Sequence, residues 1–202
     1  MNKNIGILML VSLLLLAWGG QDVHAQKFAV KTNLLYDATG TVNLGIEAGL
    51  APRWTFDLSG NYNGWTMPQG RLYKHALVQP EFRYWFCDRF SRHFLGIHAL
   101  GGIYNFGNLP NNFKMFGLDY SPLTNYRFEG WGAGAGLAYG YAYGYAFILG
   151  KHWNLELEAG FGYVYTEYDK FECEECGLKL EEDVPVHYIG PTKASIGLVF
   201  LF

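Results

Sequence analysis

The sequence predicts an all-β protein, an eight-stranded antiparallel transmembrane β-barrel with long surface loops, and three observations support this. Large apolar residues alternate with small or polar residues at period 2 along most of the chain, as in strands that separate an apolar from a polar environment. Aromatic residues make up 18% of the 202 residues, and 26 residues are glycine, which suits aromatic rims around a crowded interior. The chain also ends on an apolar strand that closes with Phe202.

The amino-terminal segment, residues 1–25, has the organisation of a signal peptide. A short polar start that includes Lys3 precedes an apolar run over Ile5–Trp18, and compact residues before Ala25 mark a cleavage site after that residue. A retained membrane anchor is the alternative, but the run is shorter than the ~20 apolar residues that a helical span needs. We therefore expect export through the inner membrane, with residues 26–202 forming the outer-membrane barrel.

The first three strands are expected near Lys27–Tyr36, Thr41–Ala51 and Trp54–Tyr62. In each of them a row of apolar residues opposes a polar face that carries a charged residue: Lys31, Glu47 and Asp57, respectively. If lipid surrounds the barrel, the apolar row faces outward and the charged row faces the lumen.

Three other strands repeat this pattern, the fourth near Val78–Phe86, the fifth near Leu95–Ile103 and the seventh near Trp153–Tyr165. Their polar faces add five ionisable residues: Glu81, Arg83, His98, Glu156 and Glu158. The seventh strand has the most regular alternation of the whole chain.

The sixth strand competes with a helical interpretation. Gly130–Gly150 has no charged residue and is long enough for a membrane helix. However, every even position from Gly130 to Ala146 is Gly or Ala, whereas most odd positions carry a large apolar or aromatic residue. Because this period is 2 and each interior glycine costs a helix roughly 1 kcal/mol relative to alanine, we expect a strand with a small inner face.

The last strand, Gly190–Phe202, decides the predicted location. Lys193 lies on its inner face, and four large apolar residues share the other: Ile196, Leu198, Phe200 and Phe202. A strand of this kind that ends on phenylalanine is typical of the closing strand of an outer-membrane barrel. We expect outer-membrane lipid against its apolar face and recognition of its end by the barrel-insertion machinery.

An even number of strands places both termini on the periplasmic side and sorts the connections. The short connections become periplasmic turns: Ala51–Arg53, Cys87–Arg92 and Gly150–His152. The others become surface loops: Asn63–Lys74, Asn105–Phe128, Thr166–Val186 and the short Asp37–Gly40.

The inward positions together carry charges of both signs: Lys31, Glu47, Asp57, Glu81, Arg83, His98, Glu156, Glu158 and Lys193. They could form a polar site or an ion path, that is, a narrow channel. We favour a neutralising network that plugs the lumen, because an eight-stranded barrel is only wide enough for its own side chains and buried charges must be paired. The surplus of carboxylates implies that some are protonated or that a cation lies among them.

The last predicted loop contains a C-x-x-C pair, Cys173 and Cys176, among many acidic residues. Outside the cytoplasm a local disulfide is the default for such a pair. A metal or cation site that also uses Glu172, Glu174 and Glu175 is an alternative, as are free thiols. Cys87 is expected in a turn on the opposite side of the barrel.

An enzyme is the main alternative class, since some small outer-membrane barrels carry catalytic residues near their outer rim. The candidate residues here are His75, Asp119, Ser121 and His187, but no spacing connects them into a catalytic motif. The formal net charge of −3 argues against nucleic acid as a partner. No motif calls for a cofactor.

Five segments together resemble an uncharacterised, domain-of-unknown-function family of small outer-membrane barrels from Bacteroides-type Gram-negative bacteria. They are KTNLLYD (Lys31–Asp37), QPEFRYWFC (Gln79–Cys87), HFLGIHALGGIYN (His93–Asn105), YDKFECEECG (Tyr168–Gly177) and GPTKAS (Gly190–Ser195). The resemblance implies the fold and the location but no activity, and the C-x-x-C of the family corresponds to Cys173 and Cys176. Members associated with fimbrial gene clusters suggest a role in assembling or anchoring surface structures, with a fimbrial or other surface protein as partner.

Overall fold

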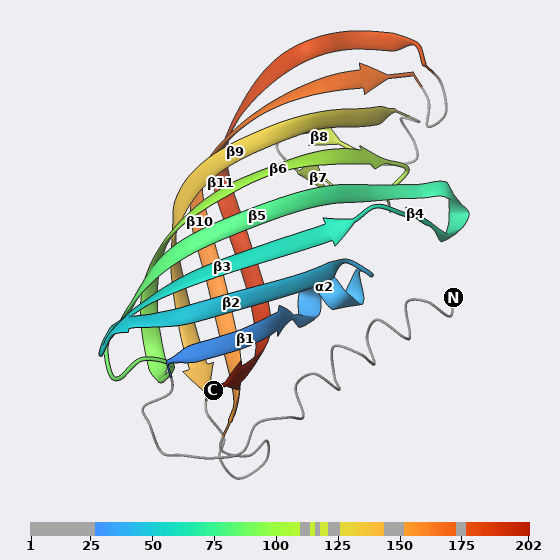
Figure 1. Cartoon of the computed structure of the whole chain (residues 1–202). Coiled ribbons are helices and arrows are strands. Elements are labelled where there is room, and N and C mark those ends of the chain that lie inside the picture. The colour runs from blue at the N-terminus through green and yellow to red at the C-terminus, as the bar shows by residue number, and fades with distance from the viewer. Residues whose placement is uncertain (1–26, 110–113, 116–117, 121–125, 144–151, 173–176) are drawn as a thin grey trace.

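A computed structural model describes residues 27–109, 114–115, 118–120, 126–143, 152–172 and 177–202 (Figure 1). The expected signal peptide, residues 1–25, lies outside the described residues. Most of the described chain is β-strand, which confirms the predicted all-β class. Within these ranges no helix is long and apolar enough to cross a membrane.

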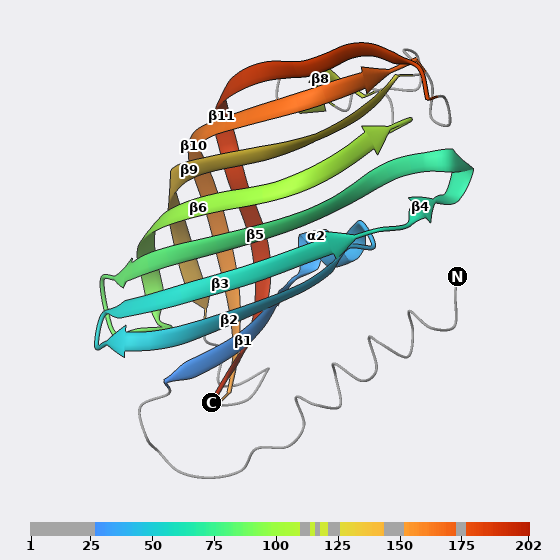
Figure 2. The same ribbon diagram turned by 45° about the horizontal axis from the view of Figure 1, so that its top comes forward.

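Eight antiparallel strands form a closed ring, as predicted (Figures 1 and 2). They are β1 (Phe28–Asn33), β2 (Val42–Ala51), β3 (Trp54–Asn63), β5 (Arg71–Trp85), β6 (Arg92–Gly107), β9 (Arg127–Tyr143), β10 (Trp153–Phe171) and β11 (Lys179–Leu201). Each pairs with its neighbours in this order, and β11 pairs back with β1, where Val30 lies opposite Phe200. The closing role predicted for the last strand therefore matches its position in the ring.

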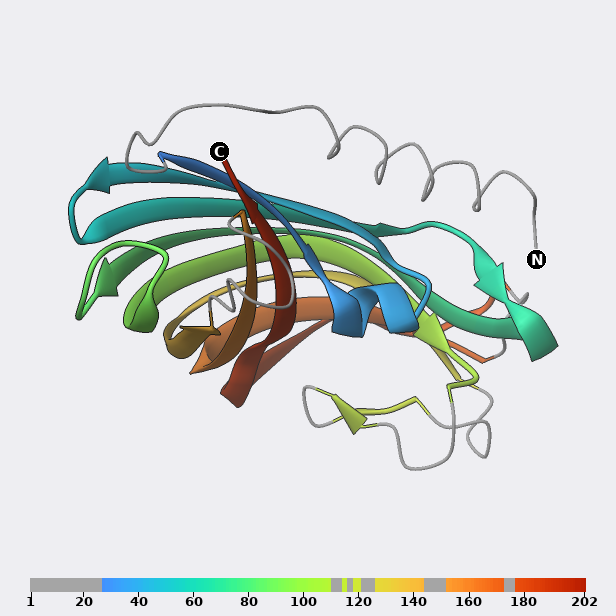
Figure 3. The same ribbon diagram turned by 90° about the horizontal axis from the view of Figure 1, so that it is seen from below.

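Short elements lie between these strands, at the edge of the ring that we call the loop end. They are α2 (Leu34–Ala38), β4 (Thr66–Met67), the 3-10 helix η1 (Pro68–Gly70), β7 (Lys114–Met115) and β8 (Leu118–Asp119). The opposite edge, the terminal end, holds the start of β1 and the end of β11, where the amide of Phe202 donates to the carbonyl of Phe28 at 2.9 Å (Figure 3).

The two faces of the ring differ in polarity at period 2. Ile97 and Leu137 are each 66% exposed on the outer face, whereas Glu47 and Arg83 on the inner face are 0% and 1% exposed. In β9 the alternation follows the predicted pattern, because Ala138 is buried while its neighbour Leu137 is exposed. The helical alternative for this segment is wrong over its described part; residues 144–151 lie outside the described residues.

The first strand is shorter than predicted. β1 ends at Asn33 instead of Tyr36, and α2 occupies part of the expected loop Asp37–Gly40. The side chain of Asn33 accepts a hydrogen bond from the amide of Leu35 at 3.1 Å, which is the capping interaction that starts a helix. A local side-chain cap therefore overrides the alternation that favoured a longer strand.

The predicted surface loops are mostly wrong in extent, because the strands continue into them. β5 begins at Arg71, inside the expected loop Asn63–Lys74, while β6 reaches Gly107 and β9 begins at Arg127, both inside Asn105–Phe128. The largest error concerns Thr166–Val186, where β10 and β11 stay paired as far as Phe171 and Lys179.

Cross-strand ion pairs explain the long β10–β11 hairpin. The Nζ of Lys170 lies 2.9 Å from a carboxylate oxygen of Glu181, and that of Lys179 lies 2.9 Å from Asp169 on the other strand and 2.8 Å from Glu182 on its own strand. Lys170 holds the pKa of Glu181 below its usual value. The acidic residues of this segment are thus divided between two strands, and Asp169, Glu181 and Glu182 are paired with the two lysines.

Two apolar clusters fill opposite ends of the ring interior. The cluster at the terminal end contains Ala29, Trp85, Phe90, Phe94, Ala142, Val199 and Leu201. The cluster at the loop end is mainly aromatic and contains Tyr104, Phe106, Leu109, Tyr120, Phe128 and Tyr168. The polar interior described below lies between them.

Gly140 provides a test of this packing. A Cβ at Gly140 would overlap the ring of the buried Phe94, whereas a Cβ at Gly60 on the outer face would meet nothing within 4 Å. We expect Gly140→Ala to lower the free energy of unfolding by about 1–3 kcal/mol, the usual cost of overpacking. Urea unfolding of the refolded protein measures this. An equal effect of Gly60→Ala would contradict the packing argument.

Candidate functional site

The nine ionisable residues predicted to face inward lie together inside the ring, and we call them the charged network. They come from seven strands: Lys31 (β1), Glu47 (β2), Asp57 (β3), Glu81 and Arg83 (β5), His98 (β6), Glu156 and Glu158 (β10) and Lys193 (β11). Eight of them are buried, and Lys193 is half-buried as a whole residue although only 7% of its side chain is exposed. β9 contributes no charge here, because its inner face consists of glycine and alanine between Gly130 and Ala142.

Arg83 lies at the centre of the charged network and contacts five carboxylates. Its Nη1 donates to Glu47 at 2.8 Å and to Glu156 at 3.1 Å, and its Nε donates to Glu81 at 3.1 Å. Its Nη2 donates to Glu158 at 2.8 Å and lies 3.4 Å from Asp57. The guanidinium also lies 4.4 Å from the ring centroid of Phe94. Because a guanidinium carries five donors in a planar fork, arginine suits this position better than lysine.

Two lysines from the adjacent strands β1 and β11 extend the charged network on either side of Arg83. Lys31 pairs with Glu47 and lies 3.3 Å from Glu156 and 3.4 Å from Asp57. Lys193 pairs with Glu81 and lies 3.1 Å from Glu158. Since β1 and β11 are the first and last strands, these contacts connect the junction where the ring closes to β2, β3, β5 and β10.

Small residues on the inner face make room for these long side chains. A Cβ at Gly45 would lie 2.6 Å from Cγ of Lys31, and a Cβ at Gly160 would lie 2.8 Å from the ring of His98 and 2.9 Å from Cβ of Lys193. The sequence analysis assigned this role to the sixth strand alone. The structure distributes it over several strands.

His98 reaches a partner that the sequence analysis missed. Its Nε2 lies 2.8 Å from Oγ1 of Thr192. Thr192 is an extra residue in β11, because Gly160 pairs with Lys193 while the next residue, Phe161, pairs with Pro191. This β-bulge turns the Thr192 side chain toward the interior. Pro191, which has no amide hydrogen for the ladder, was the only sequence signal for it.

The charged network contains more negative than positive groups, with five carboxylates against Lys31, Arg83 and Lys193. Four buried carboxylate oxygens have no hydrogen-bond partner among the described residues, one on each of Glu47, Asp57, Glu156 and Glu158. The surplus of carboxylates predicted from the sequence is therefore present inside the ring.

Little open space adjoins the charged network. A cavity of about 30 Å³ lies beside Lys31, Asp57 and Arg83, roughly the share of one water molecule in the liquid. A second cavity of about 160 Å³ lies nearer the loop end, between Gln79, Leu100 and Tyr104. On the other side, the apolar cluster around Trp85 and Phe94 fills the terminal end.

The other predicted candidates do not come together. Cys173, Cys176, Glu174 and Glu175 lie outside the described residues, and Glu172 is exposed, with its amide donating to the carbonyl of Leu178 at 3.4 Å. Among the residues described, no three side chains of metal-binding type are arranged to hold an ion.

Of the residues considered for an enzyme, the side chains of only two are described, and these histidines lie on different faces of the ring. The ring of His75 packs against the aromatic rings of Tyr36, Tyr73 and Phe106. The Nδ1 of the exposed His187 contacts the hydroxyl of Tyr163, at 2.6 Å, on the outer face. Ser121 lies outside the described residues.

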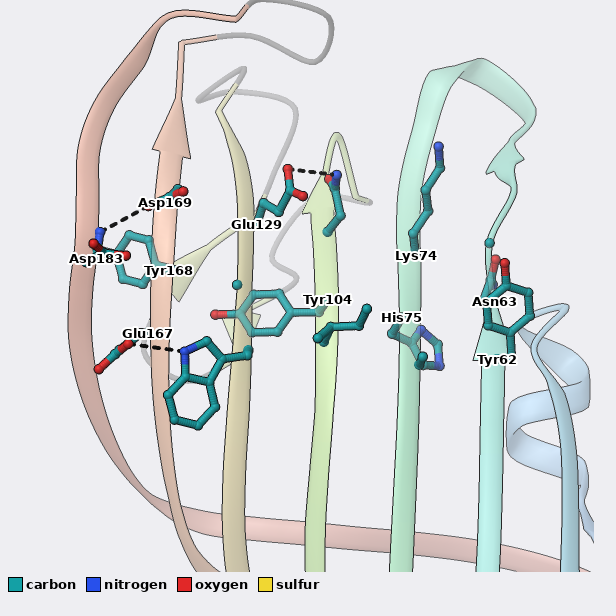
Figure 4. A pocket seen from close by; sticks show the side chains of 16 residues that line it. Tyr62, Asn63, Lys74, His75, Tyr104, Glu129, Glu167, Tyr168, Asp169 and Asp183 are labelled. Carbon is teal, nitrogen blue, oxygen red and sulfur yellow. Dashed lines mark hydrogen bonds between the residues drawn. The ribbon is translucent and has the colours of Figure 1, made fainter.

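A second site, which the sequence analysis missed, lies on the outer face at the loop end (Figure 4). It is a groove of about 410 Å³ that crosses β3, β5, β6, β9, β10 and β11, and we call it the outer groove. Acidic residues line it: Glu129, Glu167, Asp169 and Asp183. The sequence contained a signal for this site. Glu129 lies two residues from Trp131, and Glu167 two residues from Tyr165, so each acidic residue is on the outward face of its strand.

The charged network predicts a large effect of removing Arg83. We expect Arg83→Met to lower the free energy of unfolding by about 3–5 kcal/mol, because it leaves buried carboxylates without their central partner. Acidification should reduce the loss, since protonated carboxyls no longer need the cation. Lys179→Met, which breaks exposed pairs of the hairpin, should cost less than about 1 kcal/mol. Equal losses in both variants would argue against a central role for Arg83.

Comparison with known proteins identifies the family of this chain. The family described as a protein of unknown function (DUF3575) matches residues 10–202. No curated protein and no solved structure matches the chain. Since the match extends over nearly the whole length, it confirms the resemblance to an uncharacterised family that the five sequence segments indicated: the chain belongs to the DUF3575 family.

Proposed function

We propose that this chain is a non-enzymatic integral outer-membrane β-barrel with a plugged lumen, and that it serves as an anchor whose loop end binds a surface partner. The observation that carries the proposal is the inverted polarity of the ring. Ile97, Leu137 and Phe161 are more than half exposed on the outside, whereas Glu47, Arg83 and Glu156 are buried inside. Monomeric soluble proteins rarely expose a large continuous apolar surface, whereas lipid stabilises such a surface.

Aromatic residues at both margins of the apolar surface support a membrane position. Trp54 and Phe86 lie near the terminal end, and Tyr62 and Trp131 near the loop end, each at least 44% exposed. Tryptophan and tyrosine favour the interface between lipid and water, where they form girdles around barrels.

The two edges of the ring suggest an orientation. The terminal end has the short connections Ala51–Trp54 and Trp85–Arg92, whereas the loop end carries α2 and the long β10–β11 hairpin. Outer-membrane barrels have short turns on the periplasmic side and longer elements outside. We infer that the loop end faces outward after export by the signal peptide, and that Phe202 presents the last strand to the insertion machinery.

The charged network supports an anchor in preference to a channel. Arg83 and the two lysines fill the interior with paired groups, and the adjoining cavity holds about one water. A rigid, filled barrel has its loop end available for contact with another surface protein, and a fimbrial subunit is one candidate.

Insertion can be tested with two exposed apolar residues at different depths. Ile97→Arg places a charge in the apolar surface and should reduce folding into lipid bilayers, at a cost of about 2–4 kcal/mol near the midplane. Leu178→Arg, at the tip of the hairpin where Leu178 is 61% exposed, should fold normally. Heat-modifiable mobility after reconstitution reports folding. Identical behaviour of the two variants, as expected for a soluble protein, would refute the membrane assignment.

A measurement of ion conduction distinguishes a plugged barrel from a narrow channel. We expect reconstituted protein to show no steady single-channel current, because paired side chains occupy the interior. A steady current whose ion selectivity changes in Glu156→Gln would contradict the plugged anchor and indicate a channel.

A further inference from the structure

The outer groove lies beyond the margin of the apolar surface, in the zone where the ring meets the outside. Its lower part includes Tyr62, Ile103 and Trp131, which are 57%, 64% and 44% exposed on the outer face. Three of the acidic residues, Glu129, Asp169 and Asp183, lie in its upper part, whereas Glu167 lies lower, level with Trp131, its partner across the β9–β10 ladder (Figure 4). A volume of about 410 Å³ is within the range of pockets that hold specific ligands.

The outer groove has a negative charge that the protein does not neutralise. Among the described lining residues, four carboxylates face one lysine, Lys74. Asp169 and Glu129 have nearby cations, with Lys179 at 2.9 Å and Arg127 at 3.4 Å. Glu167 instead accepts hydrogen bonds from two neutral donors, the indole of Trp131 at 3.1 Å and the hydroxyl of Tyr165. These bonds fix the carboxylate in place and leave its charge unpaired.

The lining also contains an acceptor that no donor of the protein reaches. The side-chain carbonyl oxygen of Asn105, on the outer face, is buried and has no hydrogen-bond partner among the described residues. The amide group of the same side chain already donates to Glu129 at 3.5 Å. A complementary ligand must therefore supply donors and positive charge together.

Trp131 adds an aromatic surface beside the unpaired charge of Glu167. Its ring lies 5.8 Å from that of Tyr165, at 63°. A cation above an indole ring gains about 0.5–2 kcal/mol. An arginine side chain fits this combination best, because its guanidinium stacks on aromatic rings and carries five donors.

From these observations we propose that the outer groove binds an arginine-bearing segment of a protein partner at the membrane surface. The proposal rests on the outward orientation of the loop end given above and names the chemistry of the partner. A protein is favoured over lipid because the phosphate groups of outer-leaflet lipids would be repelled by the carboxylates. Arginine together with tryptophan and tyrosine is typical of the residues that dominate protein interfaces.

The test uses a short peptide with one arginine and the same peptide with citrulline, the neutral analogue of arginine. Calorimetric titration of the folded protein in detergent micelles should show that the arginine peptide binds at least about tenfold more tightly, since a charged pair is lost with citrulline. Raising the salt concentration should weaken the binding of the arginine peptide.

Matched variants locate the binding. Glu167→Gln should lower the affinity about tenfold, whereas Glu182→Gln, which removes an equal charge from the same hairpin but outside the lining, should change it less than about twofold. Trp131→Leu should weaken binding, and Trp54→Leu at the terminal end should not. Equal affinities for the two peptides, or equal effects of Glu167→Gln and Glu182→Gln, would overturn the proposal.

Two further outcomes separate this proposal from its alternatives. If a phospholipid with an ethanolamine head group displaces the arginine peptide at comparable concentration, the occupant is a lipid and the protein partner is wrong. If the protein inserts into bilayers as expected but does not bind the arginine peptide, the groove assignment fails while the membrane assignment stands.

Discussion

The contact of one guanidinium with five carboxylates inside the ring is the constraint on which the rest of the structure depends. Arg83 is 1% exposed and has acidic partners on β2, β3, β5 and β10. Buried charges are tolerated only when they are paired, so these strands must keep their register around Arg83. A slip of one residue in any of them would turn a carboxylate outward and leave its partner unpaired.

The same constraint accounts for the small residues of the inner face and for the closure of the ring. Lys31 and Lys193 reach their carboxylates across Gly45 and Gly160, where any side chain would collide with them. Because these lysines belong to the first and last strands, the charged network stabilises the seam between β1 and β11 from within. The polar groups gather inside, and the apolar groups of every strand are left on the outer face.

Alternation at period 2 was sufficient to predict the eight strands and the inward direction of the nine residues of the charged network. It could not predict the extent of the strands at the loop end. The β10–β11 hairpin continues because Lys170 pairs with Glu181 and Lys179 pairs with Asp169 across the ladder, and such pairs depend on the register. The early end of β1 depends on a single cap by Asn33, and the inward turn of Thr192 depends on a bulge. The outer groove was missed because three of its acidic residues, Glu167, Asp169 and Asp183, fell in the predicted loop Thr166–Val186, whereas the structure places them on paired strands.

The sequence by itself determined which face of each strand a residue occupies, because successive side chains of a strand point to opposite sides. It therefore determined that the outside is apolar and that charges of both signs lie within. Only the tertiary structure decided which charges meet, because closing the ring brings together residues such as Lys31 and Glu156, which are 125 positions apart. It also decided that the carboxylates of the charged network share one arginine whereas Glu167 keeps its charge at the surface, since the neighbours of a carboxylate depend on strand order and register.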